Sequence, residues 1–271
     1  MTVEFAALDA IGAIGAIGAL RIEYEWIGRD RAGRPLLVFL HEGLGSRSMW
    51  RDFPQRLCDA GDYRGLVYSR PGYGHSTPRP ADQRWGVDFM HRQAYELLPA
   101  LLRALGIGDA PWLFGHSDGG SIALLHAARF PDAVAGAVVL APHVFVEDVS
   151  VQSIRRTREA FAGSDLPQRL ARHHDDVGSA FWGWNDIWLD PAFRAWNIEA
   201  ELRAIRCPLL AIQGVDDEYG TLEQIRRIQR QVPATRLLEL QACGHSPHRD
   251  QPERVIAATV DFIAAAATAG R

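Results

Sequence analysis

The sequence predicts an α/β fold, in which a mostly parallel, doubly wound sheet carries a helical insertion. Three observations support this prediction. Short, almost entirely apolar segments recur along the 271-residue chain, as is typical of strands that are buried on both faces of a parallel sheet. Segments with helical periodicity separate several of these strands. One long interval, residues 143–200, has no such strand pattern.

The expected strands and helices alternate along the chain. After a near-alternating first strand, the apolar runs are expected to form buried strands, and three longer segments have helical periodicity. The strands are predicted at 20–28, 35–41, 65–70, 111–116, 135–141, 207–214 and 235–240, and the helices at 88–105, 119–130 and 221–231. This alternation predicts right-handed crossovers, helices on both sheet faces and functional side chains at the carboxyl ends of the strands.

The interval 143–200 is expected to be a helical cap, because a structureless loop of this length would be unusual. Residues 1–142 and 201–271 would then form the core domain. The cap holds four of the eight tryptophans, Trp182, Trp184, Trp188 and Trp196. The first three are candidate pocket residues that would favour an apolar or aromatic substrate group. Equally open is that these tryptophans only pack the cap onto the sheet.

Composition narrows the possible partners. The chain is 47% apolar and 23% charged, with a net charge of −4 and no Lys/Arg-rich run. Neither nucleic acid nor a membrane surface is therefore an expected partner. The apolar, repetitive segment 11–20 is shorter than the ~20 residues of a membrane helix, and we expect it to be a turn region between two early strands. Monomer and homodimer both stay open.

Cysteine and histidine spacing predicts neither a metal nor a cofactor. Cys58, Cys207 and Cys243 lack metal or redox spacing, which indicates reduced thiols and a cytoplasmic protein. The run HHDD at 173–176 is expected to be a solvated helix face, because four adjacent residues cannot converge on one ion from a helix.

A strand-to-helix turn carries two adjacent candidate nucleophiles. In the segment FGHSDGGS, Ser117 and Asp118 lie between an apolar run and a helical run. This is the setting of the G-x-S-x-G elbow, whose sharp turn needs small residues two positions before and after the nucleophile. Centred on Ser117 these positions are Gly115 and Gly119, whereas centred on Asp118 the first is the bulky His116. The spacing therefore predicts Ser117 as the nucleophile, and not the aspartate of an epoxide or haloacid hydrolase.

A serine hydroxyl needs a histidine base that is oriented by a carboxylate. Two later strand ends offer such groups. The segment VDDEYG supplies Asp216 and Asp217, and QACGHSPHRDQPE supplies His245 and His248. Acidic residues after a strand can also be simple turn formers, and His248 is expected to be a solvated or supporting group.

From about residue 20 to 268 the chain resembles the α/β-hydrolase family. The elbow GHSDGG, the G-x-x-D of GVDD and the GHSP that precedes QPE match the family's three catalytic segments, in the family's order. The resemblance implies an α/β-hydrolase sheet with a cap. It also implies a catalytic triad in which Ser117 is the nucleophile, Asp217 the acid and His245 the base.

The resemblance further implies an oxyanion hole formed by the backbone N–H groups of Asp118 and Gly43. The segment HEGLGS departs from the family's usual His-Gly pair, because Glu42 stands where Gly is expected. We expect a backbone conformation that an L-residue tolerates, in preference to a Glu42 side chain that serves the site. A carboxylate beside a developing oxyanion would oppose it unless protonated or paired.

Two further side chains have expected roles near this site. In SRPGYGHS, which is similar to a Gly-rich loop of the family, Ser69 replaces a commoner aspartate and is expected to shape the turn. Arg70 pointing at a substrate anion is a less favoured interpretation. The Asp118 carboxylate is expected to stabilise the start of the following helix and to turn away from the oxyanion.

The sequence therefore predicts a cofactor-free serine hydrolase of the carboxylesterase type, acting on a small-molecule ester or acyl substrate through an acyl-enzyme. Enzymes that resemble it also cleave thioesters, carbon–carbon bonds and N-terminal peptide bonds with the same triad, and they differ in cap and pocket. A member that binds a ligand without catalysis is the remaining alternative, and an intact triad argues against it.

Overall fold

The computed structural model describes residues 2–9 and 20–269, and within them eight strands form one sheet. The strands are β1 (Val3–Leu8), β2 (Leu20–Ile27), β3 (Leu36–Leu40), β4 (Arg64–Tyr68), β5 (Trp112–His116), β6 (Gly136–Leu140), β7 (Leu209–Gly214) and β8 (Arg236–Leu240). Their order across the sheet is β1-β2-β4-β3-β5-β6-β7-β8. Only the two pairings made by β2 are antiparallel, so the sheet is mostly parallel, as the sequence predicts.

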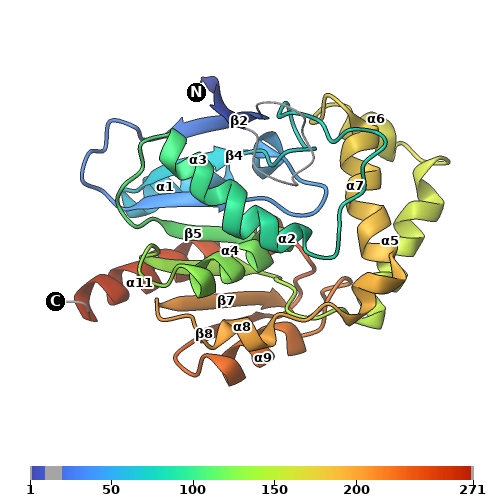
Figure 1. Ribbon diagram of the computed structural model, residues 1–271. Coiled ribbons are helices and arrows are strands. Elements are labelled where there is room, and N and C mark those ends of the chain that lie inside the picture. The colour runs from blue at the N-terminus through green and yellow to red at the C-terminus, as the bar shows by residue number, and fades with distance from the viewer. Residues whose placement is uncertain (1, 10–19, 270–271) are drawn as a thin grey trace.

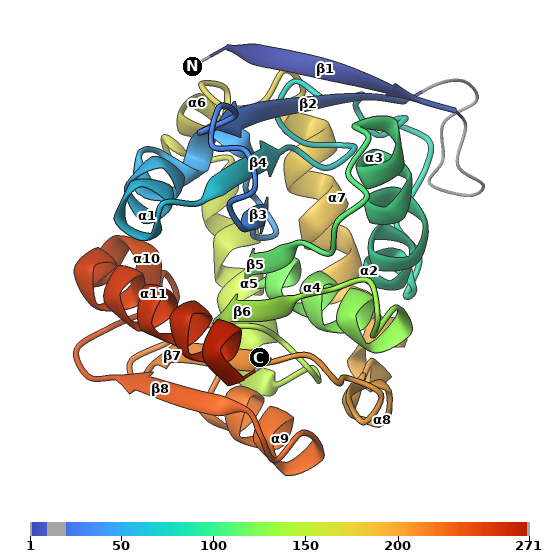
Figure 2. The same ribbon diagram turned by 90° about the vertical axis from the view of Figure 1, so that its left-hand side faces the viewer.

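Helices cover both faces of the sheet, which makes it doubly wound (Figure 2). The helices α1 (Phe53–Gly61), α10 (Pro247–Asp250) and α11 (Pro252–Ala269) lie on one face. The other face carries α2 (Phe89–Arg92), α3 (Leu98–Ala104), α4 (Asp118–Arg129), α8 (Glu199–Leu202) and α9 (Glu223–Gln231). A short 3₁₀ turn, η1 (Arg47–Trp50), precedes α1. The predicted α/β fold class is confirmed.

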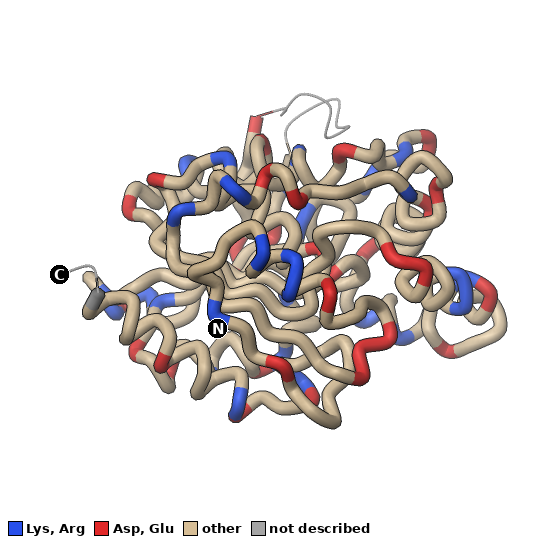
Figure 3. Tube along the Cα trace, turned by 90° about the horizontal axis from the view of Figure 1, so that it is seen from below, with Lys and Arg blue, Asp and Glu red and all other residues tan. Residues whose placement is uncertain are grey.

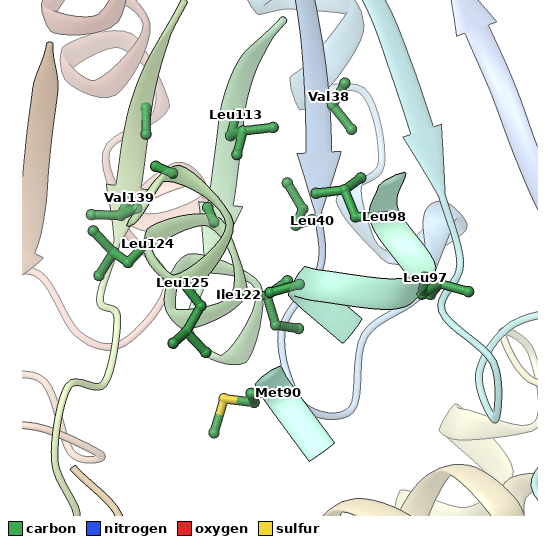
Figure 4. Packing of buried hydrophobic residues seen from close by; sticks show 14 of the residues in the cluster. Val38, Leu40, Met90, Leu97, Leu98, Leu113, Ile122, Leu124, Leu125 and Val139 are labelled. Carbon is green, nitrogen blue, oxygen red and sulfur yellow. The ribbon is translucent and has the colours of Figure 1, made fainter. Parts of the chain in front are cut away.

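Alternate residues of each central strand enter different cores. In β3, Val38 and Leu40 pack toward α4, whereas Leu37 and Phe39 pack toward α1 and α11. Figure 4 shows the first of these cores, where Ile122 of α4 lies among strand and helix side chains. All five residues are fully buried. Burying such a side chain contributes about 1.5–3 kcal/mol, so the continuous apolar runs are explained by burial on both faces.

The predicted helix 88–105 is interrupted. Between α2 and α3 the backbone widens into a π-helical turn, η2 (Gln93–Leu97), directly before a helix that holds Pro99. Proline has no N–H to donate and its ring clashes with the preceding turn, and a π-turn is one way to accommodate such a break. The helix predicted at 119–130 is α4, and the one predicted at 221–231 begins two residues later, as α9.

A helical segment separates β6 from β7, as the sequence predicts. It comprises α5 (Asp148–Phe161), α6 (Leu166–Leu170), α7 (Val177–Leu189) and η3 (Pro191–Ala195). Figure 1 shows α5 and α7 side by side beyond one end of the strands. The two ends of the segment meet, because Phe145 pairs with Asn197. Domain boundaries at 142/143 and 200/201 stay a prediction, and α8 runs across the second of them.

Two sequence expectations need comment. The predicted turn at 11–20 falls almost entirely on residues 10–19, which lie outside the described residues, although β1 and β2 are the two early strands it would join.

The expectation of a solvated helix face at 173–176 is wrong for His174. That side chain is buried, accepts a hydrogen bond from the Gly74 N–H at 2.9 Å and lies 3.1 Å from the Leu44 carbonyl oxygen. The run is a turn that ties the cap segment to the core.

Acidic and basic residues are interspersed over the face in Figure 3. Among the described residues, no helix has the length and apolar composition that crossing a bilayer requires.

Candidate active site

Ser117 occupies the apex of a strained turn between β5 and α4. Its φ of 53° and ψ of −121° lie outside the regions that an L-residue prefers. A Cβ added at Gly115 would lie 2.3 Å from the Gly119 carbonyl oxygen, and one added at Gly119 would lie 2.0 Å from the Leu40 carbonyl oxygen. Both positions therefore require glycine, which is the spacing that selects Ser117 over Asp118 in the sequence.

The side chains of Ser117, His245 and Asp217 form one hydrogen-bonded chain. Ser117 Oγ lies 2.9 Å from His245 Nε2, and His245 Nδ1 lies 2.8 Å and 3.0 Å from the two Asp217 carboxylate oxygens. The three residues come from the ends of β5, β8 and β7, far apart in sequence. A parallel sheet brings such ends to one edge, and this arrangement has the geometry of a nucleophile, base and orienting acid.

Asp217 is held in an ionised, fixed position. Its carboxylate accepts hydrogen bonds from the N–H groups of Tyr219 at 2.8 Å and Gly220 at 3.2 Å, and from the Gln213 amide at 3.0 Å. Burial raises the pKa of Asp217, but His245 and the Tyr219 N–H more than offset burial, so the pKa is lowered overall. Burial lowers the pKa of His245, and Asp217 reverses this, so the pKa is raised overall.

The other candidates for the acid and the base, Asp216 and His248, lie outside this hydrogen-bonded chain. Asp216 is exposed to solvent. Of the two expected roles of His248, solvated or supporting, the first is wrong, because its side chain is buried behind the site, with its ring centroid 4.8 Å from that of His116. His116 in turn donates from Nε2 to the His245 carbonyl oxygen, at 2.7 Å. His116 therefore supports the backbone of His245, and His248 packs against His116.

A cavity of about 150 Å³ opens at Ser117. Its walls come from the core loops and from two cap helices, α5 and α7. They comprise Glu42, Gly43, Leu44, His116, Ser117, Asp118, His143, Ile154, Trp184, Trp188, Tyr219, His245 and Ser246. An apolar cavity of this size holds a ligand as large as benzene, so the space beside the serine suits a small acyl or ring group.

Trp182 is not among the cavity residues, which corrects one expectation. It packs instead against Phe161 and Phe181, with ring centroids 5.5 Å and 4.9 Å away. Trp184 and Trp188 are four residues apart and share one face of α7, whereas Trp182 is two residues before Trp184 and faces the other way. The cap tryptophans therefore divide between cavity lining and cap packing.

Gly43 and Asp118, the expected oxyanion donors, both line the cavity. Asp118 is the first residue of α4, so its N–H has no partner within the helix. Gly43 is confined by the cap, since a Cβ there would lie 2.2 Å from Trp184 Cδ1. A larger residue at position 43 would therefore displace either Trp184 or the loop.

The Glu42 backbone is in an ordinary region for an L-residue, since its φ is not positive. Its side chain nevertheless lines the cavity, with Oε2 3.6 Å from His116 Nδ1 and Oε1 3.4 Å from Arg249 Nη2. Burial raises the pKa of Glu42, but His116 and Arg249 more than offset it and hold the pKa well below its usual range. The cavity wall therefore carries a paired negative charge.

The Asp118 carboxylate does more than stabilise a helix end. It is buried, with Oδ1 accepting from Trp188 Nε1 at 3.1 Å and Oδ2 4.0 Å from Arg70 Nη2. Burial raises its pKa, and Arg70 partly opposes this. Arg70 itself does not line the cavity. It is fully buried beneath the loop that carries Gly43, so the interpretation of Arg70 as a direct substrate contact is wrong.

The Ser69 side chain ties its loop to the neighbouring strand β2 and to Arg47. Its hydroxyl donates to Glu23 Oε2 at 2.6 Å and accepts from the Arg47 N–H at 2.9 Å. Glu23 of β2 thus supplies a carboxylate next to the serine. This contact agrees with a structural role for Ser69.

Sequence reasoning missed His143, Ile154 and Tyr219. His143 follows β6, where strand-end placement alone could have identified it. Its ring packs edge-on against Trp188, with centroids 4.8 Å apart, and burial lowers its pKa to about 3, so it is neutral at ordinary pH. No cluster of three or more His, Cys, Asp or Glu side chains arranged to hold a metal ion occurs in the described part of the chain.

The family follows from comparison with known proteins. Residues 37–258 match the model of the alpha/beta hydrolase family, which spans well over half of the chain. The chain therefore belongs to the alpha/beta hydrolase family.

Individual relatives differ in their reactions. A 2-succinyl-6-hydroxy-2,4-cyclohexadiene-1-carboxylate synthase from Enterobacter sp. (strain 638) is 26% identical over 273 residues, covering 87% of this chain and 95% of that protein. A thermophilic esterase from Thermogutta terrifontis superposes with a TM-score of 0.73 at 21% identity, covering 97% and 99% of the two chains. The enol-lactonase from Burkholderia xenovorans LB400 gives 0.74 at 21% identity, covering 96% and 100%. At these identities the two structures show a shared fold.

Proposed function

We propose that the protein is a serine hydrolase that cleaves a small carboxylic ester through an acyl-enzyme. The observation that carries the proposal is the chain from Ser117 Oγ through His245 to Asp217, with distances of 2.9 Å and 2.8 Å, at a strained strand-to-helix turn. His245 removes the proton of Ser117 as the hydroxyl attacks the ester carbonyl. Asp217 fixes the imidazole and stabilises the imidazolium that forms.

The backbone N–H groups of Gly43 and Asp118 then bind the oxyanion of the tetrahedral intermediate. His245 returns the proton to the leaving alcohol, and Ser117 is left acylated. A water molecule activated by His245 attacks the acyl-enzyme and releases the acid. The small cavity beside Ser117, with Ile154 and Trp184 in its wall, supports a short acyl or ring group as the part bound there.

A second candidate function is the reaction of the Enterobacter synthase, which this chain resembles. The compound in that protein's name carries a ring carboxylate and a succinyl group, hence two negative charges. No Lys or Arg is among the described residues that line this cavity, whereas the ionised Glu42 is. A dianion would meet an unfavourable charge here, so a neutral ester is favoured.

The decisive experiment compares esters, acyl thioesters, a dienyl diketone and an N-terminal prolyl amide as substrates. Wild type and Ser117→Ala are measured in parallel, with Ser164→Ala, an exposed cap serine, as the matched control. We expect esters to be turned over fastest and only Ser117→Ala to abolish turnover. Full activity in Ser117→Ala would contradict the proposal. Tight inhibition of ester turnover by the synthase's named compound would favour the second candidate.

A further inference from the structure

Arg70 is a buried cation inside the core. Its side chain is fully buried, and it lies directly beneath the loop formed by residues 41–43. Burying a guanidinium is costly unless its charge and donors are used. Arg70 does not line the cavity at Ser117. Its contacts inside the core must therefore explain its presence.

The guanidinium holds one carbonyl group of the oxyanion loop. Arg70 Nη2 donates to the Glu42 carbonyl oxygen at 2.8 Å. His41 supplies a second donor to the same oxygen. The Arg70 backbone N–H donates to His41 Nε2 at 3.0 Å, which places the His41 proton on Nδ1, and Nδ1 lies 2.8 Å from the Glu42 oxygen. The Gly45 backbone N–H is a third donor to this oxygen, at 3.0 Å. The Arg70 guanidinium is therefore the charged member of three donors that hold this carbonyl.

The same peptide unit carries the expected oxyanion donor. The Glu42 carbonyl and the Gly43 N–H belong to one peptide bond, and the described residues contain no cis peptide. In a trans peptide the C=O and N–H point in opposite directions. Hydrogen bonds to the carbonyl polarise the amide and strengthen its N–H as a donor, most of all when the bond is charge-assisted.

Arg70 also contacts the residue that carries the second expected oxyanion donor. Asp118, whose backbone N–H is that donor, places its carboxylate Oδ2 4.0 Å from Arg70 Nη2. Its other oxygen accepts from Trp188 Nε1 at 3.1 Å. Arg70 thus contacts both the Glu42–Gly43 peptide and the Asp118 side chain, the two places that carry the expected oxyanion donors.

We propose that Arg70 is a positioning residue for the oxyanion hole. Its guanidinium holds the Glu42–Gly43 peptide with the Gly43 N–H directed at the substrate oxygen and makes that N–H a stronger donor. Arg70 never touches the substrate. This inference rests on the proposed serine-hydrolase function and adds a residue to its machinery.

The test compares Arg70→Met and Arg70→Lys with wild type on an aryl ester and on the matching thionoester. The sulfur of a thionoester is a weak hydrogen-bond acceptor, so its hydrolysis gains little from the N–H donors. Arg79→Met is the matched control, because Arg79 is also buried, donates to the Pro80 carbonyl oxygen and lies outside the site. Thermal unfolding is followed for every variant.

Arg70→Met is expected to lower kcat for the ester by about 10- to 100-fold, less than the roughly 100- to 1000-fold cost of deleting a donor. KM and the thionoester rate should change little, so the ester-to-thionoester ratio falls. Arg70→Lys should lie between, and Arg79→Met should keep the wild-type ratio. If Arg70→Met folds poorly because Asp118 is left unpaired, the double variant Arg70→Met/Asp118→Asn removes both charges, and it should show the same fall in the ratio.

Equal losses on the two substrates, or an unchanged ratio in a folded variant, would overturn the role of Arg70 and leave the proposed function intact. A wild-type enzyme that turns over neither substrate would overturn the proposed function, and this inference with it.

Discussion

Trp184 of the cap lies directly against the backbone of Gly43 in the core. A Cβ atom added at Gly43 would be 2.2 Å from Trp184 Cδ1 and 2.4 Å from its Nε1. Real Cβ atoms do not approach other heavy atoms so closely, so the cap keeps this position only while residue 43 is glycine. A cap helix and the proposed oxyanion loop are therefore fitted to each other.

Gly43→Ala is expected to lower kcat for a small ester by roughly 100-fold, because a displacement of about 1 Å at a reacting centre has a cost of this size. The new methyl group must move either Trp184 or the Gly43 N–H. Steady-state kinetics with p-nitrophenyl acetate measures the loss. Gly43→Ala/Trp184→Ala removes the clash with Trp184 and leaves only a tighter contact with Asp118 Oδ2 at 3.2 Å, so part of the activity should return. A double variant no more active than Gly43→Ala would show that the contact is not the cause.

Gly119→Ala is expected to destabilise the protein by about 1 to 3 kcal/mol, the usual cost of overpacking a tight site. Its methyl group would lie 2.0 Å from the Leu40 carbonyl oxygen, which is rigid backbone of β3. Urea unfolding monitored by tryptophan fluorescence measures the change. Gly163→Ala is the control, since a Cβ there meets no atom within 4 Å. Equal stability of the two variants would contradict the tight elbow.

The pH profile depends on the His245–Asp217 pair. The general base must be neutral, and the net effect of Asp217 and burial raises the pKa of His245 above its ordinary 6.5. For wild type, kcat/KM should therefore rise with pH through a midpoint above 6.5. In Asp217→Asn the lowering effect of burial on the pKa of His245 is no longer offset by Asp217, so the midpoint should move down. We also expect kcat to fall by about 10,000-fold. A midpoint that stays in place would exclude Asp217 as the partner of the base.

Ile154→Ala is expected to widen the cavity and shift the preference from acetyl toward longer acyl esters. Ile154 is buried and lies in the cavity wall, so the space gained adjoins the serine. The variant should lose about 2 to 5 kcal/mol of stability. Ratios of kcat/KM across acetyl, butyryl and hexanoyl esters measure the shift. An unchanged ratio would place the acyl group outside this cavity.

Local spacing predicted the parts of the molecule that depend on backbone geometry. Gly115 and Gly119 around Ser117 reflect steric contacts within one turn, and those contacts are the same wherever the turn occurs. Strand-end placement narrowed the acid to Asp216 or Asp217 and the base to His245 or His248, and only the resemblance to the α/β-hydrolase family selected Asp217 and His245. The continuous apolar strands could also be predicted from the sequence, because a strand buried on both faces has no polar alternation.

Side-chain direction and distant pairing could not be predicted in the same way. Trp182 and Trp184 are almost adjacent in sequence, and only the rotation of α7 places one outside and one inside. His174 is buried because Gly74, 100 residues earlier, donates to it. Arg70 and Asp118 meet through tertiary packing that no local pattern records.

The central claim is that Ser117 attacks the carbonyl and becomes acylated. Intact-mass spectrometry after reaction with a fluorophosphonate probe, followed by peptide mapping, tests it most directly. We expect a single adduct on the peptide that contains Ser117, much slower labelling in His245→Ala, and none in Ser117→Ala. An adduct on any other residue, or an unlabelled wild-type protein that still turns over esters, would contradict it.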